Sequence, residues 1–163
     1  MQCDVLVDTF GHEHVSVFGE AAYDAGLGRF WSQQQSQTRP RCFVHPTDAE
    51  DVAVVLLLAR ATQCPFAVKG GGHSSFKGCS NSDGGITIDF FHMKQVTPSA
   101  DRKTVSIGPG NAWVDVYSVL EPQNLTVVGG RVASVGVGGF LLGGGVSRTR
   151  DFDSRHVPSR DTG

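Results

Sequence analysis

The chain carries three consecutive glycines in the segment Lys69-Gly70-Gly71-Gly72-His73-Ser74-Ser75. A short apolar run, Pro65-Phe66-Ala67-Val68, comes directly before it and is typical of a strand. Glycine adopts positive φ and has no Cβ, so such a turn can aim successive backbone N–H groups at one point. A concave row of these donors binds anions, and the usual biological anion is a phosphate or pyrophosphate. The segment therefore predicts an anion-binding loop that follows a strand.

His73 is the residue that a simple phosphate loop does not need. A neutral imidazole near physiological pH can act as a nucleophile, a base or a metal ligand. At the rim of a pyrophosphate loop it could attack the activated 8α-methyl group of a flavin, provided that its pKa leaves it unprotonated. The alternative is an ordinary turn histidine with no chemical role.

A second glycine-rich segment lies further along the chain, where eight of the seventeen positions from Gly129 to Gly145 are glycine. Neither segment has the G-x-G-x-x-G spacing of a Rossmann turn or the Gly-Lys-Ser/Thr of a Walker A loop. Two glycine-rich loops, each after an expected strand, indicate one extended ligand with several phosphates or a dinucleotide. The alternative is a pair of tight turns in an ordinary sheet.

Composition narrows the class of protein. The 163 residues suffice for one domain with a core, and the formal net charge of −2 gives no basic excess that would suggest a nucleic-acid partner. The longest apolar stretch, Val52 to Ala59, is too short to span a membrane. We therefore expect neither a nucleic-acid nor a membrane partner.

The cysteines and histidines do not indicate a metal site. Cys3, Cys42, Cys64 and Cys79 contain no C-x-x-C pair, and their even number is compatible with two disulfides or none. The run His12-Glu13-His14 is more typical of a solvated loop than of a ligand set, so no metal is expected. No signal peptide is readable at the N-terminus, which leaves the localisation open.

The periodicity of apolar residues predicts an α+β domain. Thr47, with Glu50 three residues later, is expected to cap a helix that runs to about Gln63. Asn111 is expected to cap a second helix that ends near Pro122. Its buried side is expected to comprise Val114, Val116, Tyr117 and Leu120. Strands are expected at residues 43–44, 66–68, 86–89, 104–107 and 125–128.

The two ends of the chain differ from the middle. Residues 1–37 form a polar and irregular extension, in which Tyr23, Phe30 and Trp31 are expected to pack onto the domain. Residues 38–147 form the domain itself. Residues 148–163 have few large apolar side chains and no period, and they are predicted to be a disordered tail.

Several segments together carry a resemblance to a known family. They are Tyr23 with Trp31-Ser32-Gln33-Gln34, Arg41 to Thr47, Cys64 to Ser74, Gly85 to Asp89, Gly108-Pro109-Gly110, and Val135 to Gly145. The combination resembles the FAD-binding domain of the vanillyl-alcohol-oxidase/p-cresol-methylhydroxylase (PCMH-type) group. Within that group it is most similar to the berberine-bridge-enzyme-like oxidoreductases of fungi. The resemblance implies an α+β fold that holds FAD.

The resemblance also implies which residues contact the cofactor. The loop around the FAD pyrophosphate would comprise Lys69, Gly70, Gly71, Gly72, His73, Ser74 and Ser75. Backbone contacts with the adenosine and pyrophosphate side would come from Gly129, Gly130, Val135, Gly136, Gly138, Gly139, Gly143, Gly144 and Gly145. His73 occupies the position that the family links to the flavin 8α-methyl group. Val132 stands where doubly linked members have a cysteine, which implies a single covalent bond. Cys3 and Cys64 occupy places that resemble a disulfide of secreted members.

The implied function is that of an FAD-dependent oxidoreductase, which transfers a hydride from a small organic substrate to flavin N5. The resemblance stops after Ser147, and nothing in the chain resembles the substrate domain that usually supplies the catalytic base. The chain is thus expected to be a truncated member in which no catalytic residue can be named. The alternative is a non-catalytic FAD-binding fragment or an inactive remnant.

Overall fold

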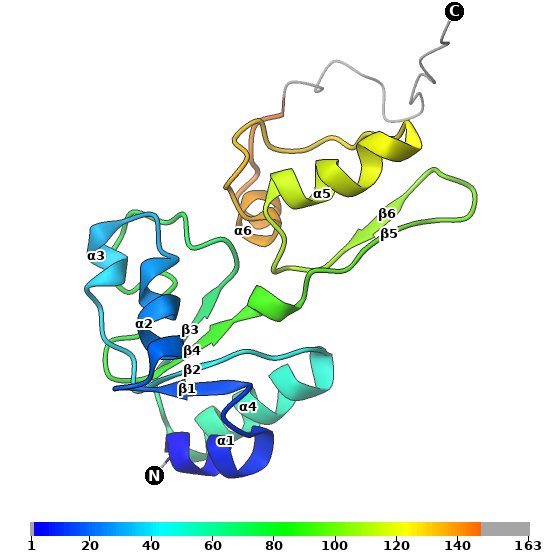
Figure 1. The fold of residues 1–163 in the computed structure, drawn as a ribbon. Helices are drawn as coiled ribbons and strands as arrows, with labels where there is room; N and C mark the ends of the chain where they lie inside the picture. The colour runs from blue at the N-terminus through cyan, green and yellow to red at the C-terminus, as the bar shows by residue number, and fades with distance from the viewer. Residues whose placement is uncertain (1, 148–163) are drawn as a thin grey trace, which may run out of the picture.

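The computed structural model describes residues 2–147 and places them in two lobes (Figure 1). The first lobe, residues 2–92, is built on a four-stranded sheet. The second lobe, residues 93–147, contains a two-stranded hairpin and two helices. Helices and strands are mixed in both lobes, as the α+β prediction requires. The predicted tail, residues 148–163, lies outside the described residues.

The sheet of the first lobe has the strand order β1-β2-β4-β3. Its three parallel strands are β2 (Cys42–Val44), β4 (Ile86–Asp89) and β3 (Phe66–Lys69), and β1 (Val15–Val17) pairs antiparallel with β2. Helix α4 (Ala49–Thr62) connects β2 to β3, because parallel strands need a crossover connection. The carboxyl ends of β2, β3 and β4 therefore lie at one edge of the sheet, and the first glycine-rich segment begins there.

Helix α4 begins one residue later than predicted. Its N-cap is Asp48, whose carboxylate accepts a hydrogen bond from the backbone N–H of Asp51 at 2.9 Å. The Asp51 carboxylate in turn accepts from the backbone N–H and the hydroxyl of Thr47, both at 2.8 Å. The predicted pairing of Thr47 with Glu50 was wrong because Asp48, one residue on, supplies a better acceptor at the N-cap.

Residues 2–36 are regular, and the prediction of an irregular segment was wrong. They form α1 (Gln2–Phe10), β1, α2 (Ala21–Gly28) and α3 (Gln33–Ser36). Figure 1 shows α1 and α4 on one face of the sheet and α2 and α3 on the other. The buried Val15 and Leu6 join the core around β2 and β4, so this segment supplies part of the hydrophobic core.

The disulfide joins Cys3 to Cys42 and ties α1 to β2. The pairing of Cys3 with Cys64 that the resemblance implied is therefore wrong for this chain. Cys64 is a buried free thiol in the same core cluster, so the three sulfur atoms lie in one region of the core. The choice between the two partners depends on how α1 lies against the sheet, and sequence spacing does not contain that information.

The second lobe is built from the hairpin β5 (Val96–Pro98) and β6 (Val105–Ile107), with α5 (Trp113–Leu120), the 3₁₀ turn Glu121–Gln123 and α6 (Val137–Leu142). Its core gathers around three side chains of α5, Trp113, Val116 and Leu120. Strand β5 and helix α6 were not predicted, and residues 125–128 do not form the expected strand.

The boundary of α5 also differs from the prediction. The N-cap is Ala112, whose N–H donates to the Asp115 carboxylate at 2.9 Å, whereas the side chain of Asn111 donates to the carbonyl of Gly108. Val114, expected on the buried side, is 46% exposed, and Trp113 occupies the core instead. Trp113, Val116 and Leu120 recur at the spacing of one helical face, and Val114 lies off that face.

In the described part of the chain, none of the helices has both the length and the apolar character needed to cross a membrane.

Candidate cofactor-binding site

The first glycine-rich segment leaves the carboxyl end of β3 at the sheet edge described above. Within the described residues, the backbone N–H groups of Gly70, Gly71, Gly72 and His73 donate no hydrogen bond to a carbonyl or a side chain. Gly72 has a φ of +65°, which only glycine adopts without strain and which turns the chain at this point. The loop thus offers successive unpaired donors, as an anion site requires.

The two glycine-rich segments meet at Gly71 and Gly136. A Cβ atom on either residue would overlap the backbone of the other, so the two main chains are in direct contact. Gly136 is the N-cap of α6, and the contact brings the second lobe against the loop that follows β3. The sequence pattern predicted two loops that share one ligand, and the structure places them side by side.

The imidazole of His73 is held between two residues that the sequence analysis did not assign to the site. Its Nε2 lies 2.9 Å from the hydroxyl oxygen of Ser134, which belongs to the second lobe. Its ring stacks on the Trp31 indole, with 5.8 Å between ring centroids and an interplanar angle of 16°. Burial lowers the pKa of His73 from its ordinary value, so the imidazole is neutral at neutral pH.

Residues 31–35, the segment that contains Trp31, also form hydrogen bonds with the loop and the residues that follow it. The backbone N–H of Trp31 donates to the carbonyl of Gly72 at 3.1 Å, and the Ser32 hydroxyl donates to the carbonyl of Ser75 at 3.2 Å. The side chain of Gln35, fully buried, donates to the Ser80 hydroxyl at 3.1 Å. Trp31 was expected to pack onto the domain, yet it is 66% exposed and its contact is with the site. The only sequence signal for this role was its membership of the segments that carry the family resemblance.

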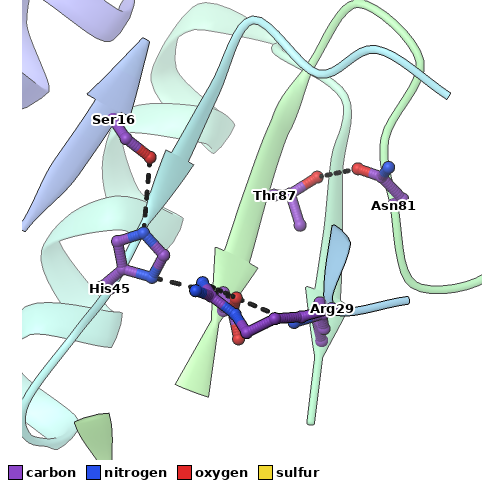
Figure 2. Close-up of polar contacts among 7 residues, drawn as sticks. Ser16, Arg29, His45, Asn81 and Thr87 are labelled. Atoms are coloured by element: carbon purple, nitrogen blue, oxygen red, sulfur yellow. Dashed lines mark hydrogen bonds and ion pairs between the residues drawn. The ribbon is translucent and has the colours of Figure 1, made fainter. Parts of the chain in front are cut away.

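Lys69, predicted to be part of the phosphate loop, points the other way. Its ammonium is buried and lies 2.9 Å from Oδ2 of Asp89, the last residue of β4. The Arg29 guanidinium reaches the same oxygen at 3.1 Å (Figure 2). Burial lowers the pKa of Lys69, and the Asp89 charge opposes that shift. The side chain of Lys69 is therefore engaged with the end of β4, and the donors that the loop leaves unpaired are backbone N–H groups.

His45 lies beside this ion cluster, between Ser16 and Arg29 in Figure 2. Its Nε2 is 3.4 Å from the Ser16 hydroxyl, and its Nδ1 is 3.9 Å from Asp89, too far for a hydrogen bond. Burial lowers the pKa of His45 to about 4, although Asp89 acts in the opposite direction. This histidine is a neutral core residue.

The glycines of the second glycine-rich segment are of two kinds: some are packed against side chains, and others have free space where a Cβ atom would lie. A Cβ on Gly129 or Gly130 would overlap the Trp113 ring, and one on Gly145 would overlap Phe140. Their lack of a side chain is therefore explained by packing within the second lobe. Val135 is half-buried in the same lobe, and its carbonyl accepts from the N–H of Trp113 at 3.1 Å.

The open positions lie on α6 and just after it. Gly138 has only distant neighbours around its Cβ position, and Gly139 and Gly144 have none within 4 Å. Gly143 is the C-cap of α6 and contacts the carbonyl of Gly139. Since α6 begins at the contact with Gly71, Gly138 and Gly139 are the residues of this segment that remain nearest to the loop with free space around them.

Across the described residues there is no group of three or more histidine, cysteine, aspartate or glutamate side chains that could hold a metal ion.

Comparison with protein-family models matches residues 40–157 to the FAD-binding domain family. The chain belongs to this family. The match covers the loop, His73 and the second glycine-rich segment, and it extends past Ser147. The predicted identity as a PCMH-type FAD-binding domain is thereby confirmed, and the unpaired N–H groups of the loop fit a cofactor with a pyrophosphate.

Individual relatives agree with this assignment. The chain is 50% identical over 127 residues to the FAD-dependent monooxygenase FUP4 of Fusarium proliferatum, an alignment that covers 78% of the chain and 24% of that protein. Among solved structures, 6-hydroxy-D-nicotine oxidase from Arthrobacter nicotinovorans is similar, with a TM-score of 0.68 and 25% identity over 76% of the chain and 26% of the oxidase. A berberine-bridge-enzyme-like protein of Physcomitrella patens has the same TM-score, 24% identity, and coverage of 77% and 27%. The FAD-binding domain described here thus spans about a quarter of the length of the relatives it matches.

Proposed function

We propose that this chain is the FAD-binding part of an FAD-dependent oxidoreductase, in which a small organic substrate gives a hydride to flavin N5. The observation that carries the proposal is the loop of unpaired N–H groups with the neutral imidazole of His73 at its end. The flavin supplies the redox chemistry, and the protein binds and orients it. Relatives named as FAD-dependent monooxygenases support the same class of reaction.

The FAD pyrophosphate is proposed to lie on the loop of Gly70, Gly71, Gly72 and His73. Its negative charge would be met by backbone N–H dipoles, because the ammonium of Lys69 is already engaged with Asp89. Gly138 and Gly139 would approach the same group from the second lobe, since their Cβ positions are open. Ser74 and Ser75 continue the loop beyond His73.

We further propose that His73 forms the single covalent bond to the flavin. A ring nitrogen of His73 would form a C–N bond to the 8α carbon. In balance, the 8α-methyl group and the imidazole would each give up one proton, and dioxygen, as the oxidant, would accept the two electrons with two protons to give hydrogen peroxide. Neutral imidazole is the form that can attack, and burial favours it. The side chain of Val132 offers no second nucleophile.

A non-catalytic FAD-binding role is the second candidate. Among the described residues, the polar and aromatic side chains that contact His73 are Ser134 and Trp31, and neither is a base at neutral pH. The site as described can hold a cofactor, while a group that takes a proton from a substrate is not assigned.

One experiment tests the covalent bond. The chain is expressed with ample FAD and run on a denaturing gel, where flavin fluorescence should travel with the protein band. The His73→Ala variant should lose all of the fluorescence, because the only proposed nucleophile is removed. His12→Ala, a matched change at a histidine whose side chain is 65% exposed, should keep it.

The outcomes separate the two candidates. If the purified wild-type protein carried no flavin, either covalently or non-covalently bound, the cofactor assignment would be contradicted. Peroxide production over a panel of small organic substrates would support the oxidoreductase, and bound flavin that no substrate reduces would support the non-catalytic role.

A further inference from the structure

Ser134 and Trp31 contact His73 from two different parts of the chain. Trp31 follows α2 in the first lobe, whereas Ser134 precedes the Gly136 contact in the second lobe. The aromatic contact restricts the plane of the imidazole, and the hydrogen bond at 2.9 Å restricts its rotation within that plane. Together the two contacts define one orientation of the ring.

Both contacts are themselves anchored. The backbone N–H of Trp31 donates to the carbonyl of Gly72, the residue just before His73. The main-chain segments that carry the indole and the imidazole are therefore hydrogen-bonded to each other. Ser134 is held beside the loop because Gly136, two residues on, is in backbone contact with Gly71. The orientation of His73 therefore depends on the docking of the second lobe onto the loop.

The hydrogen bond also distinguishes the two ring nitrogens. Nε2 is engaged with Ser134, and no side chain or carbonyl within the described residues is bonded to Nδ1. A neutral imidazole carries one N–H and one lone pair. If Nε2 donates its proton to the Ser134 oxygen, the lone pair lies on Nδ1, which is the nitrogen without a protein partner.

We propose that Ser134 and Trp31 are positioning residues for flavin attachment, which hold His73 as the Nε2–H tautomer with the lone pair of Nδ1 available for the 8α carbon. This inference rests on the covalent bond proposed above and assigns the residues that prepare it. When the C–N bond forms at Nδ1, the proton on Nε2 leaves along the hydrogen bond to the Ser134 oxygen. Ser134 is exposed, so the proton passes to solvent.

The first test measures the ring itself in the protein without cofactor. In ¹⁵N-histidine-labelled chain, His73 should show a protonated Nε2 and an unprotonated Nδ1 at neutral pH. Ser134→Ala should shift the two nitrogen resonances toward the average of a mixed tautomer, and Ser134→Thr, which keeps the hydroxyl, should restore the wild-type pattern. Ser106→Ala, at an exposed serine on β6, is the control and should leave the resonances unchanged. A protonated Nδ1 in the wild type would overturn the proposal.

The second test measures the rate of covalent flavin incorporation into purified chain supplied with FAD. Loss of one hydrogen bond of ordinary strength predicts an incorporation about fivefold slower in Ser134→Ala. Trp31→Leu should slow incorporation, with Trp31→Phe partly restoring it through a smaller stacked ring. Unchanged rates and an unchanged tautomer in Ser134→Ala would overturn the positioning role even though wild-type flavin attachment stands. If the wild type attaches no flavin, the covalent bond is contradicted, and the nitrogen resonances still decide the tautomer.

Discussion

Among the histidines that the structure describes, burial lowers the pKa of His45 and His73, and of these two His73 lies where a ligand can reach it. His45 is buried just after the end of β2 beside an ion cluster, whereas His73 is half-buried at the end of a loop with unpaired donors. The same physical cause, loss of solvation, makes one residue a packing element and the other a candidate nucleophile. The two roles differ because His45 is enclosed beside the Asp89 ion cluster, whereas His73 lies at a partly exposed loop.

The depressed pKa of His45 predicts a pH dependence of stability. Its pKa is about 4 when folded and near the ordinary 6.5 when unfolded, so the unfolded chain binds the extra proton between these values. The stabilisation is present above pH 6.5 and is lost as the pH falls toward 4. The shift corresponds to about 2 to 3 kcal/mol over that window.

Urea unfolding at a series of pH values measures this contribution. His45→Asn should flatten the dependence of unfolding free energy on pH between 6.5 and 4, and Ser106→Ala, at an exposed serine that does not titrate, should leave the slope at the wild-type value. Equal slopes in the wild type and His45→Asn would contradict the assignment.

At the scale of elements, the contact between the loop after β3 and the start of α6 organises the site. Gly71 and Gly136 are required because two main chains touch where any Cβ would collide. Composition pointed to close backbone approach in this segment. From the sequence, this close approach was assigned to the cofactor alone. In the structure, Gly71 and Gly136 approach each other, and three other glycines approach the rings of Trp113 and Phe140.

Gly71→Ala should therefore disturb both stability and cofactor uptake. The added methyl group forces the second lobe away from the loop, at an expected cost of about 1 to 3 kcal/mol in unfolding free energy. Flavin incorporation should fall in parallel, because Ser134 moves away from His73. Gly28→Ala, where the Cβ meets open space at the end of α2, is the matched control and should be neutral or slightly stabilising. Thermal unfolding and gel fluorescence of the two variants provide the comparison, and equal behaviour would refute the contact.

At the scale of the whole first lobe, Asp89 connects two neighbouring strands of the sheet to helix α2. Its carboxylate lies at the end of β4 and binds Lys69 at the end of β3 and Arg29 at the end of α2. A buried ion pair adds little folding stability compared with apolar packing, but removing one partner leaves an uncompensated buried charge. The cluster thus fixes the base of the loop against α2.

Asp89→Asn should destabilise the chain by about 3 to 5 kcal/mol, since Lys69 and Arg29 lose their counter-charge. The exposed pair of Lys77 and Asp83, at 3.0 Å, provides the control, and Asp83→Asn should change the unfolding free energy by less than about 1 kcal/mol. Chemical denaturation of both variants gives the values. A loss in Asp89→Asn as small as in the control would show that the cluster is not structurally important.

Much of the fold was predictable where a local pattern reports on local structure. The strands at 66–68 and 86–89 and the long helix before them were found because apolar spacing and capping residues act within a few positions. The N-terminal helices, strand β5 and the cysteine pairing were missed, since their stability comes from packing onto distant elements. Helix α6 was missed because three of the seven residues from Gly136 to Leu142 are glycine, which disfavours a helix.

The family, and a glycine-rich segment after a strand that ends in a histidine, could be read from the amino-acid sequence alone. These depend on covalent properties of residues in one short segment: glycine without a Cβ, and imidazole with a pKa near neutrality. The surroundings of that histidine depend on how the chain folds. Trp31 and Ser134 contact His73 from positions far apart in the chain, and Gly136 belongs to the same segment as Ser134. Lys69 pairs with Asp89 because β4 ends beside β3. Contacts of this kind are set by packing, which sequence spacing does not encode.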